Sequence, residues 1–194
     1  MSADPYWNHN THYHRWLLDR IPSTARTALD IGCGDGLLAG KIARRCESVL
    51  GVDLDAEVLT RAIPAEGVTY RRTDFRHLEG RFDFVTAVAS LHHVPLREGL
   101  AALRGLVAPG GTLAVIGLWR MSRLGDPLYL PLIPVIRLVD LLHPTVTDPA
   151  PLAQPRETLR EIRTAAREAL PGARLRRRLM WRYSLLWHNR APSE

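Results

Sequence analysis

The sequence has few cysteines, no long uninterrupted apolar run and almost no lysine. Its 194 residues include only two cysteines, Cys33 and Cys46, which are too few for the disulfide framework of a small secreted protein. The N-terminus opens with polar and aromatic residues rather than an apolar core, so we expect no signal peptide. A protein of a reducing compartment, the cytoplasm, is the expectation that follows.

The apolar residues are too interrupted to cross a membrane. The longest apolar stretch, residues 128–142, contains two prolines together with Arg137 and Asp140. With 46% hydrophobic and 24% charged residues, the composition is that of a globular protein and excludes a disordered or fibrous chain. We expect one domain over residues 1–194 and no transmembrane segment, with contact at a membrane surface left open.

The scarcity of lysine leaves a surplus of arginine. Lys41 is the single lysine among 26 basic residues. Residues 1–97 hold 12 basic and 12 acidic side chains, whereas residues 98–194 hold 14 and 8, so the second half carries the whole net charge of +6. Such a surface could attract nucleic acid, but GC-rich coding also favours arginine. We interpret the surplus as a solvated surface.

Short apolar runs alternate with helix-forming segments up to residue 118. The predicted strands cover residues 27–31, 48–53, 68–71, 82–88 and 112–118, and the predicted helices cover 5–21, 37–43, 56–62 and 97–107. This alternation is typical of βαβ units that build a parallel sheet covered on both faces.

The alternation stops in residues 119–155, which are rich in proline and leucine and show no clean period. A helix is predicted over 156–170. Two short strands follow at 174–180 and 182–188, too close together for a crossover helix, so they must pair as an antiparallel hairpin. The predicted fold is α/β, a doubly wound sheet of about seven strands, mostly parallel, with a C-terminal antiparallel hairpin.

A glycine-rich turn follows the first predicted strand. Residues 30–36 read Asp-Ile-Gly-Cys-Gly-Asp-Gly, in which glycines let the backbone turn sharply and let a ligand approach near a helix N-terminus. The dinucleotide pattern Gly-x-Gly-x-x-Gly fails because its last place is Leu37, which disfavours a nicotinamide enzyme. Alone, the turn would equally suit a tight loop that binds nothing.

Polar residues stand at the ends of the next strands. Asp53 ends the second strand, where a carboxylate can accept both ribose hydroxyls of an adenosine. Asp74 and Phe75 offer a carboxylate and a ring for the amine and the face of adenine. The fourth strand leaves the sheet at residues 90–94. Carboxyl ends of parallel strands share one edge, where open α/β sheets bind their ligands.

In this order, the motifs resemble those of class I S-adenosylmethionine-dependent methyltransferases, above all the group with ubiquinone/menaquinone-biosynthesis and natural-product enzymes. The residues that carry the resemblance are Ala28–Gly36, Gly51–Leu54, Asp74–Phe75, Phe82–Val85, Leu91–Val94 and Pro109–Leu113. It covers residues 12–118 firmly and the C-terminal hairpin loosely. It implies a Rossmann-like fold, S-adenosylmethionine as cofactor and S-adenosylhomocysteine as product.

The resemblance also implies residue roles around the methionine and ribose parts of the cofactor. The backbone at Gly32 and Gly34 would run past the methionine part of the cofactor, and Asp30 would brace the glycine loop. Asp53 would take the ribose, and the backbone near Ala89 would bind the cofactor's amino group.

The remaining implied roles concern adenine and a cap. Leu54 and Phe75 would flank the adenine ring, and Asp74 would bind its exocyclic amine. Tyr13 would cap the cofactor from an N-terminal cap helix within residues 1–22.

Two departures disfavour nucleic acid as the acceptor. Enzymes that methylate amino groups of adenine carry Asn/Asp-Pro-Pro-Tyr after the fourth strand, where this chain reads Ala-Ser-Leu-His over residues 89–92. A cytosine-C5 enzyme needs a nucleophilic cysteine, but Cys33 lies in the glycine turn and Cys46 in or after the first helix. We interpret both as packing residues.

His92 and His93 are the candidate catalytic residues. An imidazole that titrates near neutrality can remove a proton from an acceptor hydroxyl or an acidic carbon. The alternative is that one packs or caps the chain. We expect no metal, because adjacent residues seldom point at one ion and no matching carboxylate cluster is evident.

Four arginines lie on the first strand of the hairpin. Alternation sends Arg174, Arg176 and Arg178 to one face and Arg177 to the other. Charges on an edge strand prevent unwanted pairing, and this interpretation is preferred over attraction of RNA or an acidic acceptor, because no aromatics interleave on the basic face.

The sequence thus predicts an enzyme that methylates a small, hydrophobic or aromatic acceptor. Alternatives are an RNA methyltransferase and a non-catalytic domain that kept the fold. Residues 119–155 are expected to form a lid over the acceptor, since they follow the fifth strand and are too apolar to stay solvated. The alternative is that these residues form one or two extra helices that cover part of the core.

The sequence leaves the oligomeric state open.

Overall fold

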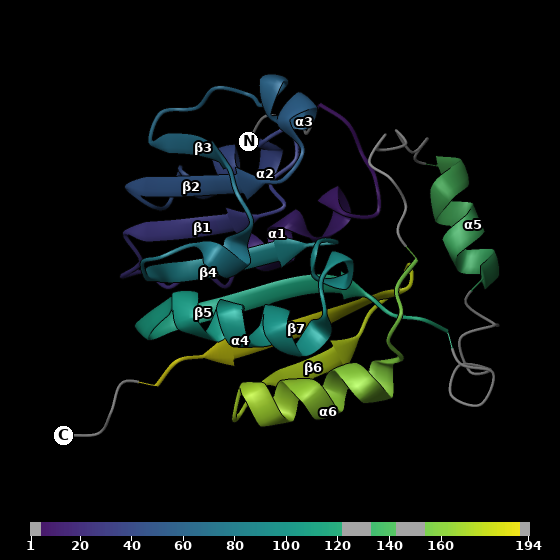
Figure 1. The fold of residues 1–194 in the computed structure, drawn as a ribbon. Coiled ribbons are helices and arrows are strands. Elements are labelled where there is room, and N and C mark those ends of the chain that lie inside the picture. Colours follow the sequence, from purple (N-terminus) through teal and green to yellow (C-terminus); the bar gives the residue numbers. More distant parts are fainter. Residues whose placement is uncertain (1–4, 122–132, 143–153, 191–194) are drawn as a thin grey trace.

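A seven-stranded sheet organises the protein (Figure 1). The computed structural model describes residues 5–121, 133–142 and 154–190. The strands are β1 (Thr27–Ile31), β2 (Ser48–Asp53), β3 (Val68–Arg72), β4 (Phe82–Val88), β5 (Val107–Leu118), β6 (Arg174–Arg177) and β7 (Arg182–His188), in the order β3-β2-β1-β4-β5-β7-β6. The first five pair in parallel, and β7 runs antiparallel between β5 and β6. The predicted Rossmann-like α/β sheet with a C-terminal antiparallel hairpin is confirmed.

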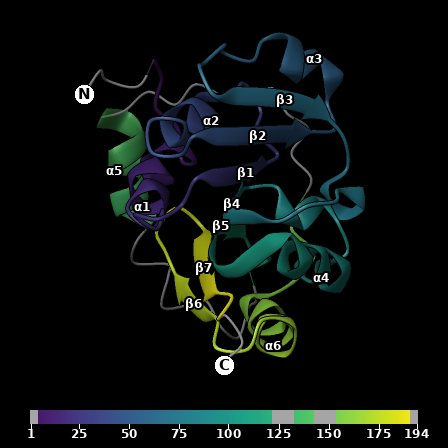
Figure 2. The same cartoon turned by 90° about the vertical axis from the view of Figure 1, so that its left-hand side faces the viewer.

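Helices cover both faces of this sheet. They are η1 (Thr11–Tyr13), α1 (His14–Leu18), α2 (Leu37–Ile42), α3 (Ala56–Thr60), η2 (Phe75–His77), η3 (Leu91–His93), α4 (Leu96–Leu106), α5 (Ile133–Leu142) and α6 (Leu159–Ala169). Figures 1 and 2 show α1 and α2 on one face, with α4 and α6 on the other. Within the described ranges, no helix is long and apolar enough to cross a membrane.

The core divides into two apolar clusters, one on each face. Val115 of β5 belongs to the cluster with Leu103 of α4, whereas its neighbour Ile116 belongs to the cluster with Leu17 of α1 and Ile42 of α2. Successive side chains of a strand point to opposite faces, so one central strand anchors both helix layers.

A carboxylate at the amino edge aligns β1 with β4. Asp83 accepts hydrogen bonds from the backbone N–H groups of Arg26 and Thr27, each at 2.9 Å, and from the Thr27 hydroxyl at 3.0 Å. Burial acts to raise the pKa of Asp83, but the bonds from Thr27 and Arg26 outweigh it and leave that pKa below its usual value. The pair fixes the register in which Ala28 faces Phe84.

The N-terminal helix is shorter than the predicted 5–21, because Asn8 starts it. Asn8 Oδ1 accepts from the backbone N–H groups of Asn10 and Thr11 at 2.9 and 2.8 Å, as an N-cap does. Of residues 5–22, only Thr11–Leu18 are helical. Residues 5–10, which we call the strap, lie outside this helix and run past the glycine turn at the carboxyl edge of the sheet.

The hairpin strand β6 ends at Arg177, before the predicted residue 180. Met180 and Trp181 have positive φ of 57° and 52°, and the N–H of Arg182 donates to Leu179 O at 3.2 Å. Left-handed residues at both central positions are typical of a tight two-residue hairpin turn. This turn lies at the carboxyl edge, because Arg182 pairs with Leu118 at the end of β5.

Most of the expected lid over residues 119–155 lies outside the described residues. Residues 119–121, 154 and 155 and the backbone of α5 are described. Figure 1 shows α5 beyond the carboxyl edge of the sheet. The lid therefore stays a prediction.

We expect Gly117→Ala to destabilise the fold and Gly105→Ala to leave it unharmed. A Cβ at Gly117 would collide with the ring of Tyr183, which is 2% exposed and cannot move aside. Overpacking of this kind costs about 1–3 kcal/mol. Nothing lies within 4 Å of a Cβ at Gly105 in α4, where alanine is the better helix former. Urea unfolding of both variants tests this; equal stabilities would contradict it.

Candidate active site

Three glycines lie in the turn between β1 and α2. Two of them are packed against neighbouring side chains, and the third has open space beside it. Gly32, Gly34 and Gly36 have positive φ of 65°, 56° and 77°. A Cβ at Gly32 would collide with Ser90, and one at Gly36 with Tyr70, whereas nothing lies within 4 Å of a Cβ at Gly34. The backbone at Gly34 is therefore the part of the turn that a ligand can approach.

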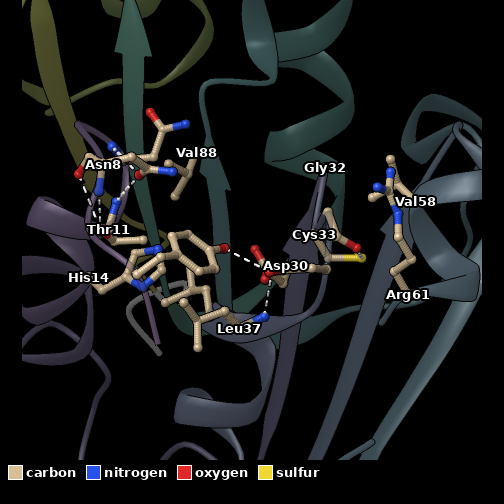
Figure 3. A pocket seen from close by; sticks show the side chains of 15 residues that line it. Asn8, Thr11, His14, Asp30, Gly32, Cys33, Leu37, Val58, Arg61 and Val88 are labelled. Carbon is tan, nitrogen blue, oxygen red and sulfur yellow. Dashed lines mark hydrogen bonds between the residues drawn. The ribbon is translucent and has the colours of Figure 1, made fainter. Parts of the chain in front are cut away.

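Two adjoining cavities open beside this turn. The first, which we call the loop cavity, encloses about 310 Å³ and is lined by Tyr6, His14, Asp30, Asp35 and Arg61 among others (Figure 3). The second, the strand-end cavity, encloses about 290 Å³ and is lined by Asp53, Leu54, Asp74, Phe75, Ala89 and His93 among others. Five residues line both cavities: Asn10, Gly32, Gly34, Val58 and Val88. The two cavities are thus parts of one elongated site.

A buried carboxyl group dominates the loop cavity. Asp30 is 2% exposed, and its Oδ2 has no hydrogen-bond partner among the described residues. Burial, followed by the nearby carboxylates of Asp53 and Asp35, raises the pKa of Asp30 to about 8. Asp30 and Asp35 line the loop cavity and Asp53 lines the adjoining strand-end cavity, and this gathering of carboxyl groups favours a ligand that brings positive charge.

The strap before η1 closes the loop cavity from one side. The Tyr6 hydroxyl donates to Asp35 Oδ2 at 2.7 Å. His14 also lines the cavity, and Lys41 Nζ donates to its Nδ1 at 3.0 Å. The single lysine of the chain therefore fixes a histidine of the site.

Asp53 lines the strand-end cavity at the end of β2. Its Oδ2 accepts from the N–H of Gly34 and its Oδ1 from the N–H of Asp55, both at 3.0 Å. Each carboxylate oxygen keeps a further acceptor site for a ligand hydroxyl. Asp53 thus holds the glycine turn by a hydrogen bond that the sequence analysis did not predict.

The far end of the strand-end cavity combines apolar surface with a tied carboxylate. Leu54 is 59% exposed above the cavity, whereas Phe75 is buried in its wall. Arg76 Nη2 and Nε donate to Asp74 Oδ2 at 2.7 and 3.0 Å. These bonds from Arg76 hold the pKa of Asp74 below its usual value, so Asp74 is an acceptor at neutral pH.

A strained backbone follows β4. Ala89 has φ of 51°, a left-handed backbone conformation. This conformation costs free energy in a residue with a side chain, and such strained residues are found most often at functional sites. Ser90 Oγ lies 2.8 Å from both Ile31 O and Val88 O, which holds the ends of β1 and β4 together. The backbone of Ala89 is thereby fixed at the cavity wall.

The two histidines occupy different positions. Their ring centroids are 4.1 Å apart, but only His93 lines the strand-end cavity. Both line a neighbouring outer groove of about 910 Å³ at the starts of α4 and α6. Of the two histidines, His93 is therefore the one that reaches the strand-end cavity.

The structure places Tyr13 away from both cavities. Its ring packs in the core, and its hydroxyl donates to Leu179 O at 2.9 Å. The sequence analysis missed the cavity residues of the same region, Tyr6, Asn10 and His14. For Tyr6, the capping residue Asn8 was the signal, since it places the residues before it outside the helix; no local pattern marks Asn10 or His14.

Neither cysteine nor a metal cluster adds chemistry here. Burial raises the pKa of the Cys33 thiol, and likewise that of Cys46, which leaves both as weak nucleophiles. In the part of the chain that the structure describes, no three His, Cys, Asp or Glu side chains could hold a metal ion.

Comparison with known proteins decides the family. Residues 29–115 match the methyltransferase domain family. The chain is 38% identical to the uncharacterized methyltransferase Rv0089 of Mycobacterium tuberculosis, over 97% of this chain and 99% of that protein. The chain belongs to the methyltransferase family.

Two further methyltransferases extend this comparison. The ubiquinone biosynthesis O-methyltransferase of Pseudomonas paraeruginosa is 33% identical over 106 residues, 50% of this chain and 46% of that protein. An S-adenosylmethionine-bound amino pentose methyltransferase of Micromonospora echinaspora shares the fold, with a TM-score of 0.64 at 18% identity, over 97% and 100% of the two chains. The predicted methyltransferase with a Rossmann-like class I fold is confirmed.

We expect the stability of this methyltransferase to fall with rising pH in a way that Asp30→Asn abolishes. The folded protein holds the Asp30 proton to about pH 8, whereas the unfolded chain releases it near the ordinary value of 3.8. Stability from this group is therefore fully present below about pH 3.8 and is lost as pH rises to about 8. Urea unfolding between pH 5 and pH 9 measures it. Parallel pH profiles for both proteins would contradict the assignment.

Proposed function

We propose that this methyltransferase binds S-adenosylmethionine along its two cavities and methylates a small hydrophobic or aromatic acceptor. The observation that carries the proposal is the continuity of the cavities past the open backbone at Gly34, with acidic groups at one end and apolar walls at the other. When bound, S-adenosylmethionine supplies an electrophilic methyl group on a positively charged sulfur.

The strand-end cavity fits the adenosine part. Asp53 offers acceptor sites to the two ribose hydroxyls. The hydrogen bond from the Gly34 N–H already holds its carboxylate in place. Leu54 and Phe75 present apolar surface to a flat ring, and Asp74 stays ionised to accept from an exocyclic amine. The exposed face of Leu54 would be covered in this complex.

The loop cavity fits the methionine part. Its ammonium group would meet the Asp30 oxygen that lacks a partner among the described residues, and its sulfonium charge would lie among three carboxyl groups. Gly34 and Ala89 bring backbone atoms to the same cavities. Positive charge on the ligand thus offsets negative charge that the fold has gathered.

An aromatic or hydrophobic acceptor suits the neighbouring end of the sheet. Trp119 follows β5 and belongs to an apolar cluster, and Trp181, which precedes β7, and Trp7 of the strap pack against that cluster. The three indole side chains come from separate parts of the chain, and Trp119 and Trp181 adjoin the pair Leu118 and Arg182 at the carboxyl edge. Flat apolar surface next to a methyl donor favours a flat apolar acceptor.

RNA is the second candidate acceptor, and the arginine contacts disfavour it. The guanidinium of Arg177 lies 5.6 Å from the Trp119 ring, and that of Arg178 lies 5.2 Å from the Trp16 ring and donates to Ser184 Oγ. Arg174 and Arg176 point outward on β6, an edge strand. Arg177 and Arg178 lie against indole rings, and Arg174 and Arg176 protect an edge strand from pairing. The four arginines therefore do not form a continuous basic surface that would follow an RNA backbone.

We expect Asp53→Ala to weaken S-adenosylhomocysteine binding by about tenfold to a hundredfold, since a hydrogen bond to a charged group contributes about 1.5–3 kcal/mol. Calorimetry on the purified protein measures this. Glu66→Ala, which removes an exposed carboxylate outside both cavities, is the control. Undetectable binding by the unaltered protein, or equal affinity of the Asp53→Ala protein, would contradict the proposed function.

We expect His93→Ala to lower methyl transfer by about a hundredfold or more, the contribution of a general base, and to leave cofactor affinity nearly unchanged. The measurement is transfer of label from S-adenosylmethionine, read across pH, beside calorimetry. His77→Ala removes an exposed imidazole outside the cavities as control. A raised Michaelis constant for the acceptor with an unchanged pH profile would instead make His93 a positioning residue.

A further inference from the structure

Arg182 ties the N-terminal strap to the C-terminal hairpin. Its Nη2 and Nε donate to Asn10 Oδ1 at 3.0 and 3.3 Å, and its Nη1 donates to Met180 O at 3.0 Å. The Tyr13 hydroxyl makes a second link, to Leu179 O at 2.9 Å. The strap is therefore held by the hairpin turn at the carboxyl edge of the sheet.

This contact decides which way the Asn10 carboxamide points. A guanidinium has only donors, so the Asn10 atom that faces Arg182 must be the oxygen. The Nδ2 amide then faces away from the guanidinium, with two N–H donors. Arg182 thus removes the usual ambiguity between the two ends of an asparagine side chain.

Asn10 also stands at a particular place in the site. It is one of the five described residues that line both cavities, and the other four are glycines and valines. If the two parts of the cofactor occupy the two cavities, as the proposed function states, the shared residues flank its sulfur. Asn10 then supplies the polar side chain nearest to the transferred methyl group.

We propose that Asn10 selects an oxygen nucleophile by donating a hydrogen bond from Nδ2 to the attacking oxygen of the acceptor. This inference rests on the proposed function and names its substrate class, a phenol, catechol or carboxylic acid. In the transfer, the oxygen–carbon bond forms as the carbon–sulfur bond breaks, and the electron pair of that bond stays on sulfur. A hydroxyl acceptor gives its proton to His93.

Lone pairs explain why the donor favours oxygen over nitrogen. A neutral amine has one lone pair, and a hydrogen bond from Asn10 would occupy the pair that must attack carbon. An oxygen has at least two lone pairs, so it can accept from Asn10 and still attack with another. The same donor therefore orients one nucleophile and blocks the other.

Asn10→Asp is the sharpest test, because it keeps the contact with Arg182 and replaces the donor by an acceptor. We expect its methyl transfer to fall by about a hundredfold, and that of Asn10→Ala by about tenfold or more. S-Adenosylhomocysteine affinity by calorimetry should stay within about threefold of the unaltered protein in both variants. The melting temperature of Asn10→Asp should not fall, since an ion pair replaces the hydrogen bond.

Arg182 is a positioning residue, and its variants separate orientation from folding. Arg182→Met frees the Asn10 amide to rotate, so we expect the maximal rate to fall about threefold to tenfold with little change in acceptor Michaelis constant. Arg182→Lys can still donate to Asn10 Oδ1 and should recover most of this loss. Loss of cofactor affinity or of melting temperature in step with the rate would make Arg182 merely structural.

The nature of the labelled atom completes the test. The unaltered protein is incubated with methyl-labelled S-adenosylmethionine and the small-molecule fraction of a cell extract, and each labelled product is classed as O-methyl or N-methyl. Label on oxygen supports the inference. Label on nitrogen, or Asn10 variants that lose cofactor affinity, would overturn it and leave the proposed function intact. No label in any fraction would overturn the proposed function itself.

Discussion

The close approach of the Gly32 backbone to Ser90 is the constraint on which the site depends. Gly32 needs its left-handed φ and its missing Cβ, because Ser90 fills the space where a side chain would stand. Ser90 Oγ in turn meets the last carbonyl of β1 and that of Val88. One contact thus sets the glycine turn, the kink at Ala89 and the spacing of two strand ends, so the cavity walls form together rather than separately.

The charge of the site follows from this geometry. Burial raises the pKa of Asp30, and the meeting of the β1 and β2 ends raises it further by bringing the Asp53 carboxylate close. The fold resolves the repulsion in two ways: Asp53 receives two backbone N–H donors, and Asp30 keeps its proton. A cationic ligand relieves the same repulsion by a third route, which links binding to the proton on Asp30.

The central part of the site could be predicted because each of its features is local in sequence. The glycine turn, Asp53 and the pair Asp74 and Phe75 each follow a strand directly, and parallel strands bring their carboxyl ends to one edge. The hydrogen bond from the Gly34 N–H to Asp53 was not predicted. A carboxylate reaching across from the neighbouring strand end leaves no mark in the local pattern.

The strap could not be predicted in this way, since its conformation is set by contacts far along the chain. Tyr13 and Asn10 are close in sequence, yet one packs inward beneath the hairpin turn and the other faces the cavities. What separates them is the pairing of Asn10 with Arg182 and of Tyr13 with Leu179, at sequence separations of 172 and 166 residues.

This division gives the two halves of the site different scope for variation. The walls built on the glycine turn and the strand ends depend on backbone shape and on the carboxyl groups of Asp30, Asp53 and Asp74, which few substitutions would preserve. The wall at Asn10 depends on side chains that the two ends of the chain bring together over the sheet. In the proposed function, substitution at Asn10 or in the Met180–Trp181 turn would therefore change which acceptor atom meets the methyl group and leave the strands in place.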